Sequence, residues 1–244
     1  MQLRWLEQSE GDLPAGDDWL SRAEAGTLAA MRFPKRRADW RLGRWTAKCA
    51  VAAVLDEPRV FSEIEIRADP SGAPEVFCAG FPAPLAISIS HRAGTSCCAV
   101  AGCPVELGCD LESIEPHSRA FVADYFTLEE QRTIADAAPA DCPSVIALLW
   151  SAKESALKAL HEGLRLDTRC VVVSLLEASC DPKSWSRMLV RYTDEHRNGN
   201  RLFHGWWRLC DNVLRTVVAA PPPDSPVPLA LSEHCFEGAS SLCA

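Results

Sequence analysis

Two periods of apolar and polar residues run along this chain, and they predict its secondary structure. A spacing of three to four residues, typical of helices, occurs at 35–55, 118–137 and 144–161. A period of two, typical of strands, occurs at 86–91, 105–112, 170–175, 187–192, 202–208 and 213–219, and SCCAVA at 96–101 is predicted as another short strand. Turn signals lie at 69–74 (DPSGAP) and 194–200 (DEHRNGN). We therefore expect an α+β fold.

The predicted elements come as a helix followed by strands, and then as a second helix followed by strands. This order indicates two similar α+β halves, which we place at 1–103 and 104–220. Residues 221–244 begin with PPPDSPVP and continue as a short polar segment. We expect this end of the chain to be a loosely ordered tail.

Composition narrows the classes of protein that fit. The 33 acidic residues outnumber the 25 basic ones, and this excess argues against general nucleic-acid binding. The twelve cysteines form no CxxC pair, so we interpret them as reduced and mostly buried. The first residues do not resemble a secretory signal, and no apolar run approaches the ~20 residues of a membrane helix. We expect a cytoplasmic protein.

Acidic side chains gather on two of the predicted elements. Asp110 and Glu112 lie two residues apart on a strand, whereas Glu154 and Lys158 lie four residues apart on a helix, so each pair shares one face. Gly108 would leave room for a ligand near Asp110. Each segment alone could be an ordinary solvated face. Together, three carboxylates and a cation match the needs of a Mg²⁺ site that acts on a diphosphate.

The helix predicted at 35–55 carries a basic stripe. Its members are Arg37, Arg41, Arg44 and Lys48. Such a stripe is ordinarily a solvated helix face, but its concentration in an acidic protein also suits an anion. Ser90 and His91 close the strand at 86–91, where a histidine can be structural or can bind a ligand.

Four motifs in this order resemble one known family. They are KRRADWRLGR at 35–44, ISISH at 87–91, ELGCDLE at 106–112 and LWSAKESALKAL at 149–160. The sequence looks like the 4′-phosphopantetheinyl transferases of the two-lobed, surfactin-synthetase-activating type over roughly residues 33–175. The resemblance implies a pseudo-twofold repeat of two α+β halves with the active site in the cleft between them.

The resemblance also implies a reaction. The enzyme would transfer the 4′-phosphopantetheine group of coenzyme A to a serine of an apo acyl or peptidyl carrier protein. Adenosine 3′,5′-bisphosphate would be released. Fatty-acid, polyketide, nonribosomal-peptide and siderophore carriers all remain open, and the two-lobed form favours secondary metabolism. The alternative is a catalytically silent paralogue that binds coenzyme A or a carrier protein.

Catalytic and metal-binding roles follow from the same resemblance. Asp110, Glu112 and Glu154 would hold Mg²⁺, and Mn²⁺ suits the same oxygen ligands. Glu154 would accept the serine proton, either directly or through a water on the metal. Lys158 would stabilise the leaving phosphate or donate a proton to it. Lys153 would add positive charge near the same groups.

Coenzyme A would be held mainly by the first half. The resemblance assigns its binding to Arg36, Arg44, Ser90, His91, Asp110, Lys153 and Lys158, with Arg37 and Lys48 as support. Arginine suits phosphate because it forms bidentate hydrogen bonds. One position departs from the family pattern, because Ala73 stands in the DPSGAP turn where a lysine is often found.

The partner implied by the resemblance is a small, acidic, helical carrier protein. We expect the helical stretch at 118–137 to form part of the surface that contacts it. The family's two-lobed members work as monomers, so we expect a monomer here. The acidic net charge makes a nucleic-acid contact by the basic helix the least favoured interpretation.

Overall fold

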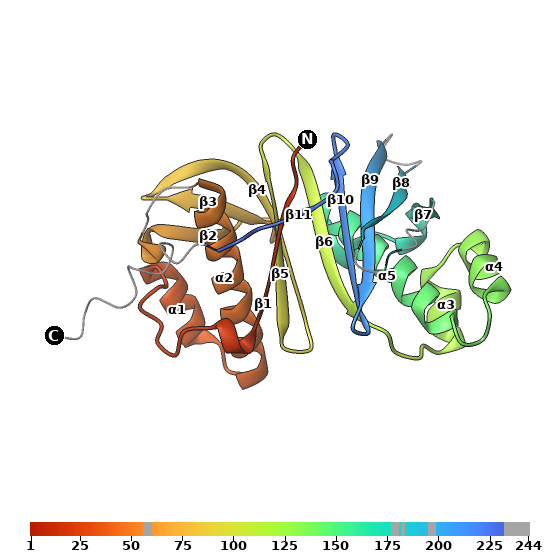
Figure 1. Ribbon diagram of the computed structural model, residues 1–244, viewed down its shortest axis with the longest axis horizontal. Coiled ribbons are helices and arrows are strands. Elements are labelled where there is room, and N and C mark those ends of the chain that lie inside the picture. The colour runs from red at the N-terminus through yellow and green to blue at the C-terminus, as the bar shows by residue number, and fades with distance from the viewer. Residues whose placement is uncertain (56–59, 177–180, 182–183, 195–198, 232–244) are drawn as a thin grey trace. The chain divides into compact units, whose positions relative to one another are not determined.

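The computed structural model describes residues 1–55, 60–176, 181, 184–194 and 199–231. The chain divides into two compact units. The N-terminal unit consists of Gln2–Pro104 together with the chain from Val227 onward, and the C-terminal unit consists of Met1 and Val105–Pro226. Each unit combines one sheet with helices, so the predicted α+β class is confirmed (Figure 1).

The N-terminal unit packs a long helix, α2, on a sheet with the strand order β11-β1-β5-β4-β3-β2. Its helices are α1 (Arg22–Ala30) and α2 (Pro34–Leu55). Its strands are β1 (Arg4–Ser9), β2 (Ile64–Ala68), β3 (Pro74–Cys78), β4 (Phe81–Arg92), β5 (Thr95–Gly102) and β11 (Val227–Pro228). Neighbouring strands are antiparallel except β11, which runs parallel to β1.

The buried side of α2 explains why this helix forms and where it packs. Trp45 is buried at the centre of the unit's hydrophobic core, with ring centroids 5.2 Å from Trp19 and 4.8 Å from Phe61. Ile87 of β4 joins the same core, as the alternation of that strand predicts. The apolar face of α2 therefore packs on the sheet. This packing does not determine the contacts of the basic residues of the helix.

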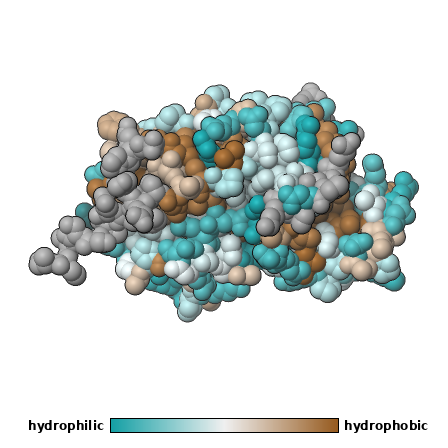
Figure 2. Space-filling view, in the orientation of Figure 1, coloured by the Kyte–Doolittle hydropathy of each residue, from teal (hydrophilic) through white to brown (hydrophobic). Residues whose placement is uncertain are grey.

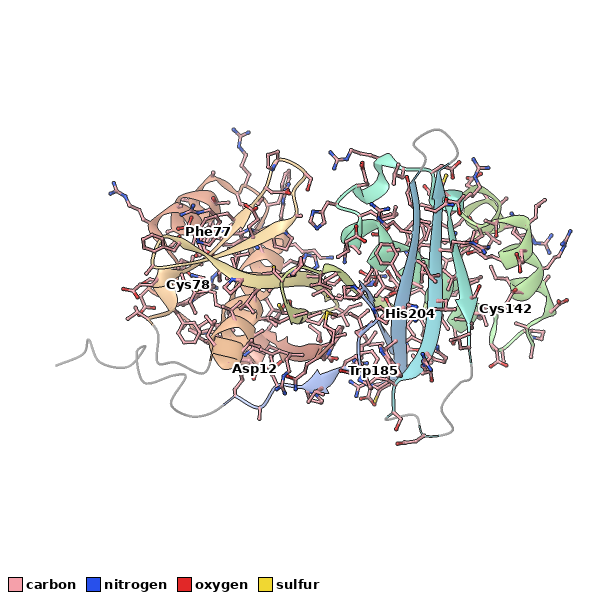
Figure 3. The ribbon with its side chains drawn as sticks, turned by 90° about the horizontal axis from the view of Figure 1, so that it is seen from above. Asp12, Phe77, Cys78, Cys142, Trp185 and His204 are labelled. Atoms are coloured by element: carbon pink, nitrogen blue, oxygen red, sulfur yellow. The ribbon has the colours of Figure 1, made fainter. Side chains whose placement is uncertain are left out.

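The C-terminal unit packs another long helix, α5, on a sheet with the order β6-β10-β9-β8-β7. Its helices are α3 (Arg119–Tyr125), α4 (Leu128–Asp136) and α5 (Cys142–Ala159). Its strands are β6 (Glu106–Ser113), β7 (Val171–Leu175), β8 (Ser186–Asp194), β9 (Gly199–Cys210) and β10 (Val213–Ala220). Cys142, labelled in Figure 3, is the first residue of α5, and Pro143 follows it in the first turn, where proline is favourable.

Helix α5 lies very close to β6, and a glycine permits this approach. A methyl group on Gly108 would overlap the carbonyl oxygen of Ser155 and would lie 2.7 Å from the backbone nitrogen of Ala159. Gly108 was expected to leave room for a ligand. The structure corrects that reason, because the space above Gly108 is filled by the backbone of α5.

Most of the predicted elements are present, with some corrections. All seven predicted strands and the helices at 35–55 and 144–161 are confirmed. The helix expected at 118–137 is two helices, because Thr127 caps a new one by accepting a hydrogen bond from the Glu130 N–H. The turn expected at 194–200 connects β8 and β9, but residues 195–198 lie outside the described residues.

The predicted tail is also partly corrected. Within 221–244, Val227 and Pro228 form β11 and pair with β1, and the Leu229 N–H donates to the Trp5 carbonyl oxygen at 2.8 Å. Residues 232–244 lie outside the described residues. Among the described residues, no helix combines the length and the apolar character needed to span a membrane.

Candidate active site

The contact between β6 and α5 brings Asp110 and Lys158 together. The Lys158 ammonium donates to Oδ1 of Asp110 at 2.8 Å and to the Cys109 carbonyl oxygen at 2.9 Å. Ser151, also on α5, donates to Oδ2 of Asp110 at 2.9 Å. Asp110 is buried, whereas the Lys158 side chain is 30% exposed. Lys158 therefore remains accessible to a ligand while it neutralises Asp110.

Glu154 lies one turn before Lys158 and shares this site. Burial raises the pKa of the Glu154 carboxyl, and the negative charge of Asp110 raises it further. The Lys158 ammonium opposes this rise, and Glu112 adds a smaller increase. Glu154, Asp110, Glu112 and Lys158 therefore lie within electrostatic range of one another, as the spacing of the two motifs predicts.

The site suits a divalent cation, although its carboxylates do not converge on one point. Within the described part of the chain, no group of three or more histidine, cysteine, aspartate or glutamate side chains is close enough to hold a metal ion. Burial, and after it the charge of Asp110, raise the pKa of Glu154, and a nearby cation would oppose both by favouring the ionised carboxylate. Carboxylate oxygens are also the ligands that Mg²⁺ prefers. The chemistry of these side chains is therefore compatible with the predicted metal, and the metal site itself stays a prediction.

Lys153 is buried, whereas its predicted role would place its ammonium near the groups of the candidate site. Its ammonium is fully buried, forms an ion pair with Glu130 at 2.9 Å, and donates to the carbonyl oxygens of Thr168, at 2.9 Å, and Val171. Residues adjacent in a helix point in different directions, so Lys153 cannot share the face of Glu154. In this structure Lys153 therefore joins elements of the C-terminal unit, and its predicted contact with coenzyme A stays a prediction.

The basic residues of the α2 stripe make different contacts. Arg37 donates to the Leu28 carbonyl oxygen, and Arg41 forms an ion pair with Asp17 at 2.7 Å. Lys48 is fully buried and forms an ion pair with Glu24 at 2.6 Å. Lys48 is therefore committed to its buried partners, whereas the contacts of Arg37 use a single guanidinium nitrogen. The supporting phosphate contacts of both residues stay predictions.

Arg44 is the member of the stripe that best suits an anion. Burial lowers the pKa of its guanidinium, and the charge of Glu24 only partly offsets this effect. The guanidinium lies over the ring of Trp40, 5.0 Å from the centroid. Among the described residues, no atom accepts a hydrogen bond from the buried Nε of Arg44. A phosphate oxygen would satisfy this donor.

The remaining predicted coenzyme A ligands lie in the same N-terminal unit. Arg36 is exposed on α2, and His91 is exposed near the end of β4. Ser90 is buried, and its carbonyl oxygen accepts a hydrogen bond from the Ser96 hydroxyl at 3.1 Å. Ala73 lies in the turn between β2 and β3, where its N–H donates to Asp69 at 2.8 Å. Arg36, Ser90 and His91 thus belong to one unit, and the residues predicted to bind the metal and to act in catalysis belong to the other.

Sequence reasoning missed three hydroxyl groups next to Asp110. Ser151 and Ser155 of α5 and Thr216 of β10 are fully buried, and their side-chain oxygens are 2.8 Å apart in successive contacts. Ser151 and Ser155 stand inside the WSAKES motif, so their positions could have drawn attention. Thr216 offers no such signal, because it is one residue in an ordinary strand pattern.

Comparison with known proteins agrees with the chemistry of the C-terminal unit. The family model of the 4′-phosphopantetheinyl transferase superfamily matches residues 106–210. The matched segment contains Asp110, Glu112, Glu154 and Lys158. The chain has no significant match among curated proteins. The family match supports a transferase of this general kind.

Proposed function

We propose that this protein transfers the 4′-phosphopantetheine group of coenzyme A to a serine of an apo carrier protein, as a two-lobed phosphopantetheinyl transferase. One observation carries the proposal. The contact between α5 and β6 gathers Asp110, Glu154 and Lys158 in a partly buried site, within the segment that the family model matches. A diphosphate substrate needs such a combination of oxygen ligands and positive charge.

The proposed reaction is a substitution at phosphorus. The serine oxygen forms a bond to the phosphorus that carries pantetheine, and the bond from this phosphorus to the bridging diphosphate oxygen breaks. Adenosine 3′,5′-bisphosphate leaves. Glu154 takes the serine proton, directly or through a water. Lys158 stabilises the charge that develops on the leaving phosphate.

A divalent cation is the expected cofactor. Asp110, Glu112 and Glu154 are the residues that would hold it. When bound, Mg²⁺ or Mn²⁺ would neutralise the diphosphate. Neighbouring side chains set the orientation of the Asp110 carboxylate. Asp110 is fixed on one oxygen by Ser151 and on the other by Lys158, and Glu112 lies two residues further along the same face of β6.

Coenzyme A would bind through the N-terminal unit. Arg44 is the principal phosphate ligand in this proposal, because its buried Nε needs an acceptor. Arg36, Ser90 and His91 complete the predicted set, and the first and last of these are exposed. Because Arg41 and Lys48 are held in ion pairs, the partly buried Arg44 is the cation of α2 that an anion would best stabilise.

The carrier protein would contact the stretch at 118–137. Apolar side chains reach the surface here, since Leu128 is 72% exposed and Tyr125 is 37% exposed (Figure 2). The ring centroids of Phe121 and Tyr125 lie 5.0 and 5.1 Å from that of Trp150 on α5. Trp150 is one turn from Glu154, so this aromatic group links the proposed contact surface to the catalytic helix.

The test is a transfer assay. Purified protein, an apo carrier protein, coenzyme A and Mg²⁺ are mixed, and the carrier is weighed by intact mass spectrometry. We expect the carrier to gain one phosphopantetheine and EDTA to abolish this gain. Carriers from fatty-acid, polyketide and nonribosomal-peptide systems should be compared, because the carrier is not identified by the site. Coenzyme A binding without transfer to any carrier would favour the silent paralogue.

A further inference from the structure

Three hydroxyl groups form a buried chain that ends at Asp110. The Ser155 and Thr216 side-chain oxygens are 2.8 Å apart, and those of Thr216 and Ser151 are also 2.8 Å apart. The Ser151 hydroxyl then donates to Oδ2 of Asp110 at 2.9 Å. All three hydroxyl residues are fully buried between α5 and β10. This chain connects the interior of the unit to one carboxylate of the proposed metal site.

The number of hydroxyl protons determines which group donates and which accepts in each hydrogen bond of this hydroxyl chain. Each hydroxyl has one proton, and an ionised carboxylate can only accept. Because Ser151 gives its proton to Asp110, the contact between Ser151 and Thr216 uses the Thr216 proton. Ser155 must then donate to Thr216. The Ser151 carbonyl oxygen, 3.0 Å from the Thr216 hydroxyl, can share the Thr216 proton without reversing this order.

The N-terminal unit shows that the scaffold does not require such a chain. Thr46 of α2 stands where Ser151 stands on α5, when the two helices are aligned on the buried lysines Lys48 and Lys153. Its hydroxyl is also fully buried, but it donates to the Leu42 carbonyl oxygen of its own helix at 2.9 Å. A buried network of several hydroxyls is costly unless every member is satisfied, so its presence beside Asp110 calls for a separate reason.

We propose that Thr216 and Ser155 are positioning residues that, through Ser151, hold Asp110 in the orientation that binds the divalent cation. This inference rests on the proposed function. Lys158 holds Oδ1 of Asp110, and the hydroxyl chain holds Oδ2, so the carboxylate is fixed from both sides. A carboxylate has about four lone-pair sites, so hydrogen bonds to both of its oxygens do not prevent it from ligating a metal. Partners of this kind orient metal ligands and tune their affinity.

The test compares Thr216→Val with Thr216→Ser. Valine keeps the shape of threonine but lacks the hydroxyl, whereas serine keeps the hydroxyl. Binding of Mn²⁺ in the presence of coenzyme A is measured from the electron paramagnetic resonance signal of free Mn²⁺, with a protein-free control for manganese held by coenzyme A. We expect Thr216→Val to weaken Mn²⁺ binding by about ten- to a hundredfold. Thr216→Ser should stay within a few-fold of wild type.

Thr46→Val provides the matched control, because it removes a fully buried hydroxyl from the other unit. It should leave Mn²⁺ binding unchanged. If Thr216→Val does not fold, Ser155→Ala replaces it and should weaken binding in the same direction. Wild-type affinity in folded Thr216→Val or Ser155→Ala would overturn the inference and leave the proposed function intact. A wild-type protein that neither binds Mn²⁺ nor transfers phosphopantetheine would overturn both.

Discussion

The two units place a buried lysine at equivalent positions of their long helices. Lys48 of α2 pairs with Glu24, and Lys153 of α5 pairs with Glu130. Both glutamates are also the third residue of a capped short helix, and each accepts a hydrogen bond from the N–H of an edge strand, β2 or β7. Each lysine also donates to two backbone carbonyl oxygens. The pair therefore connects the long helix, the short helix and the edge of the sheet in each unit.

The same two helices differ where chemistry is proposed. When they are aligned on their buried lysines, α5 has Glu154 and Lys158 at positions where α2 has Cys49 and Ala53. Helix α5 packs mainly on β6 and β10, whereas α2 packs mainly on β5. One scaffold thus appears twice, and only the C-terminal copy carries the acidic and basic residues of the candidate site. The comparison separates residues that build the fold from residues that act on a substrate.

The largest expected effect tests this separation directly. Glu154→Gln removes the proposed proton acceptor and should reduce the transfer rate by about 10²- to 10⁴-fold, the range typical of general-base catalysis. Coenzyme A should still bind, although weakly, which calorimetry can measure. Cys49→Ala, at the equivalent position of α2, should leave the rate near wild type. Unchanged transfer in Glu154→Gln would remove Glu154 from the mechanism.

The second-largest expected effect is a loss of stability when either buried lysine, Lys48 or Lys153, is replaced. Lys48→Met and Lys153→Met each leave a buried glutamate without its partner, so each should lower the free energy of unfolding by about 3–5 kcal/mol. Urea denaturation measures this loss, with the exposed Lys35→Met as control. The protein that remains folded in Lys153→Met should bind coenzyme A as wild type does. A stable Lys153→Met protein with weakened coenzyme A binding would restore the role predicted from the sequence.

These lysines also show where sequence reasoning stops. The positions of α2, α5 and seven strands follow from local sequence patterns, even though β5, β6 and β10 bury both of their faces. A lysine inside a WSAKES motif is expected to face solvent or substrate, since charged residues are seldom fully buried. Only its ion pair with Glu130, on a different helix, shows otherwise. Tertiary pairing of this kind leaves no local pattern.

The elements that were missed have similar causes. Helix α1 is short, and one of its two buried residues is Glu24, so its apolar face is barely visible in the sequence. Strand β1 buries the neighbouring residues Trp5 and Leu6, which breaks the period of two. The candidate site was more accessible to prediction. Asp110 lies on one strand face, and Glu154 and Lys158 lie on one helix face, as their spacing predicts. The packing of that helix on that strand brings the three side chains together.

A smaller effect tests the close approach that distinguishes α5 from α2. Gly108→Ala would force β6 and the α5 backbone apart, so we expect a loss of about 1–3 kcal/mol in unfolding free energy. The shift should also disturb the contact between Asp110 and Lys158 and so lower the transfer rate. Gly102→Ala, where a methyl meets no atom within 4 Å, is the control and should be close to neutral. Equal stability of the two variants would show that α5 can move without cost.

The smallest effect is a dependence of stability on pH that arises from Glu154 of the C-terminal unit. Burial and the charge of Asp110 raise the pKa of Glu154 in the folded protein above the ordinary value of 4.5. A raised folded pKa means that stability present below pH 4.5 is lost as the pH rises through the folded pKa, because the ionised carboxylate is disfavoured by folding. Glutamine has no such cost.

In EDTA at neutral pH, Glu154→Gln should therefore melt at a higher temperature than wild type. The difference should shrink as the pH is lowered below 4.5, where Glu154 of the unfolded chain is also protonated. Thermal unfolding followed by circular dichroism across this pH range measures it, with the exposed Glu129→Gln as control. Mg²⁺ should stabilise wild type more than Glu154→Gln, because only the carboxylate gains a counter-charge. A lower melting temperature for Glu154→Gln at neutral pH would mean that Glu154 stabilises the fold, as Lys153 does, and would dissolve the proposed division between the two units.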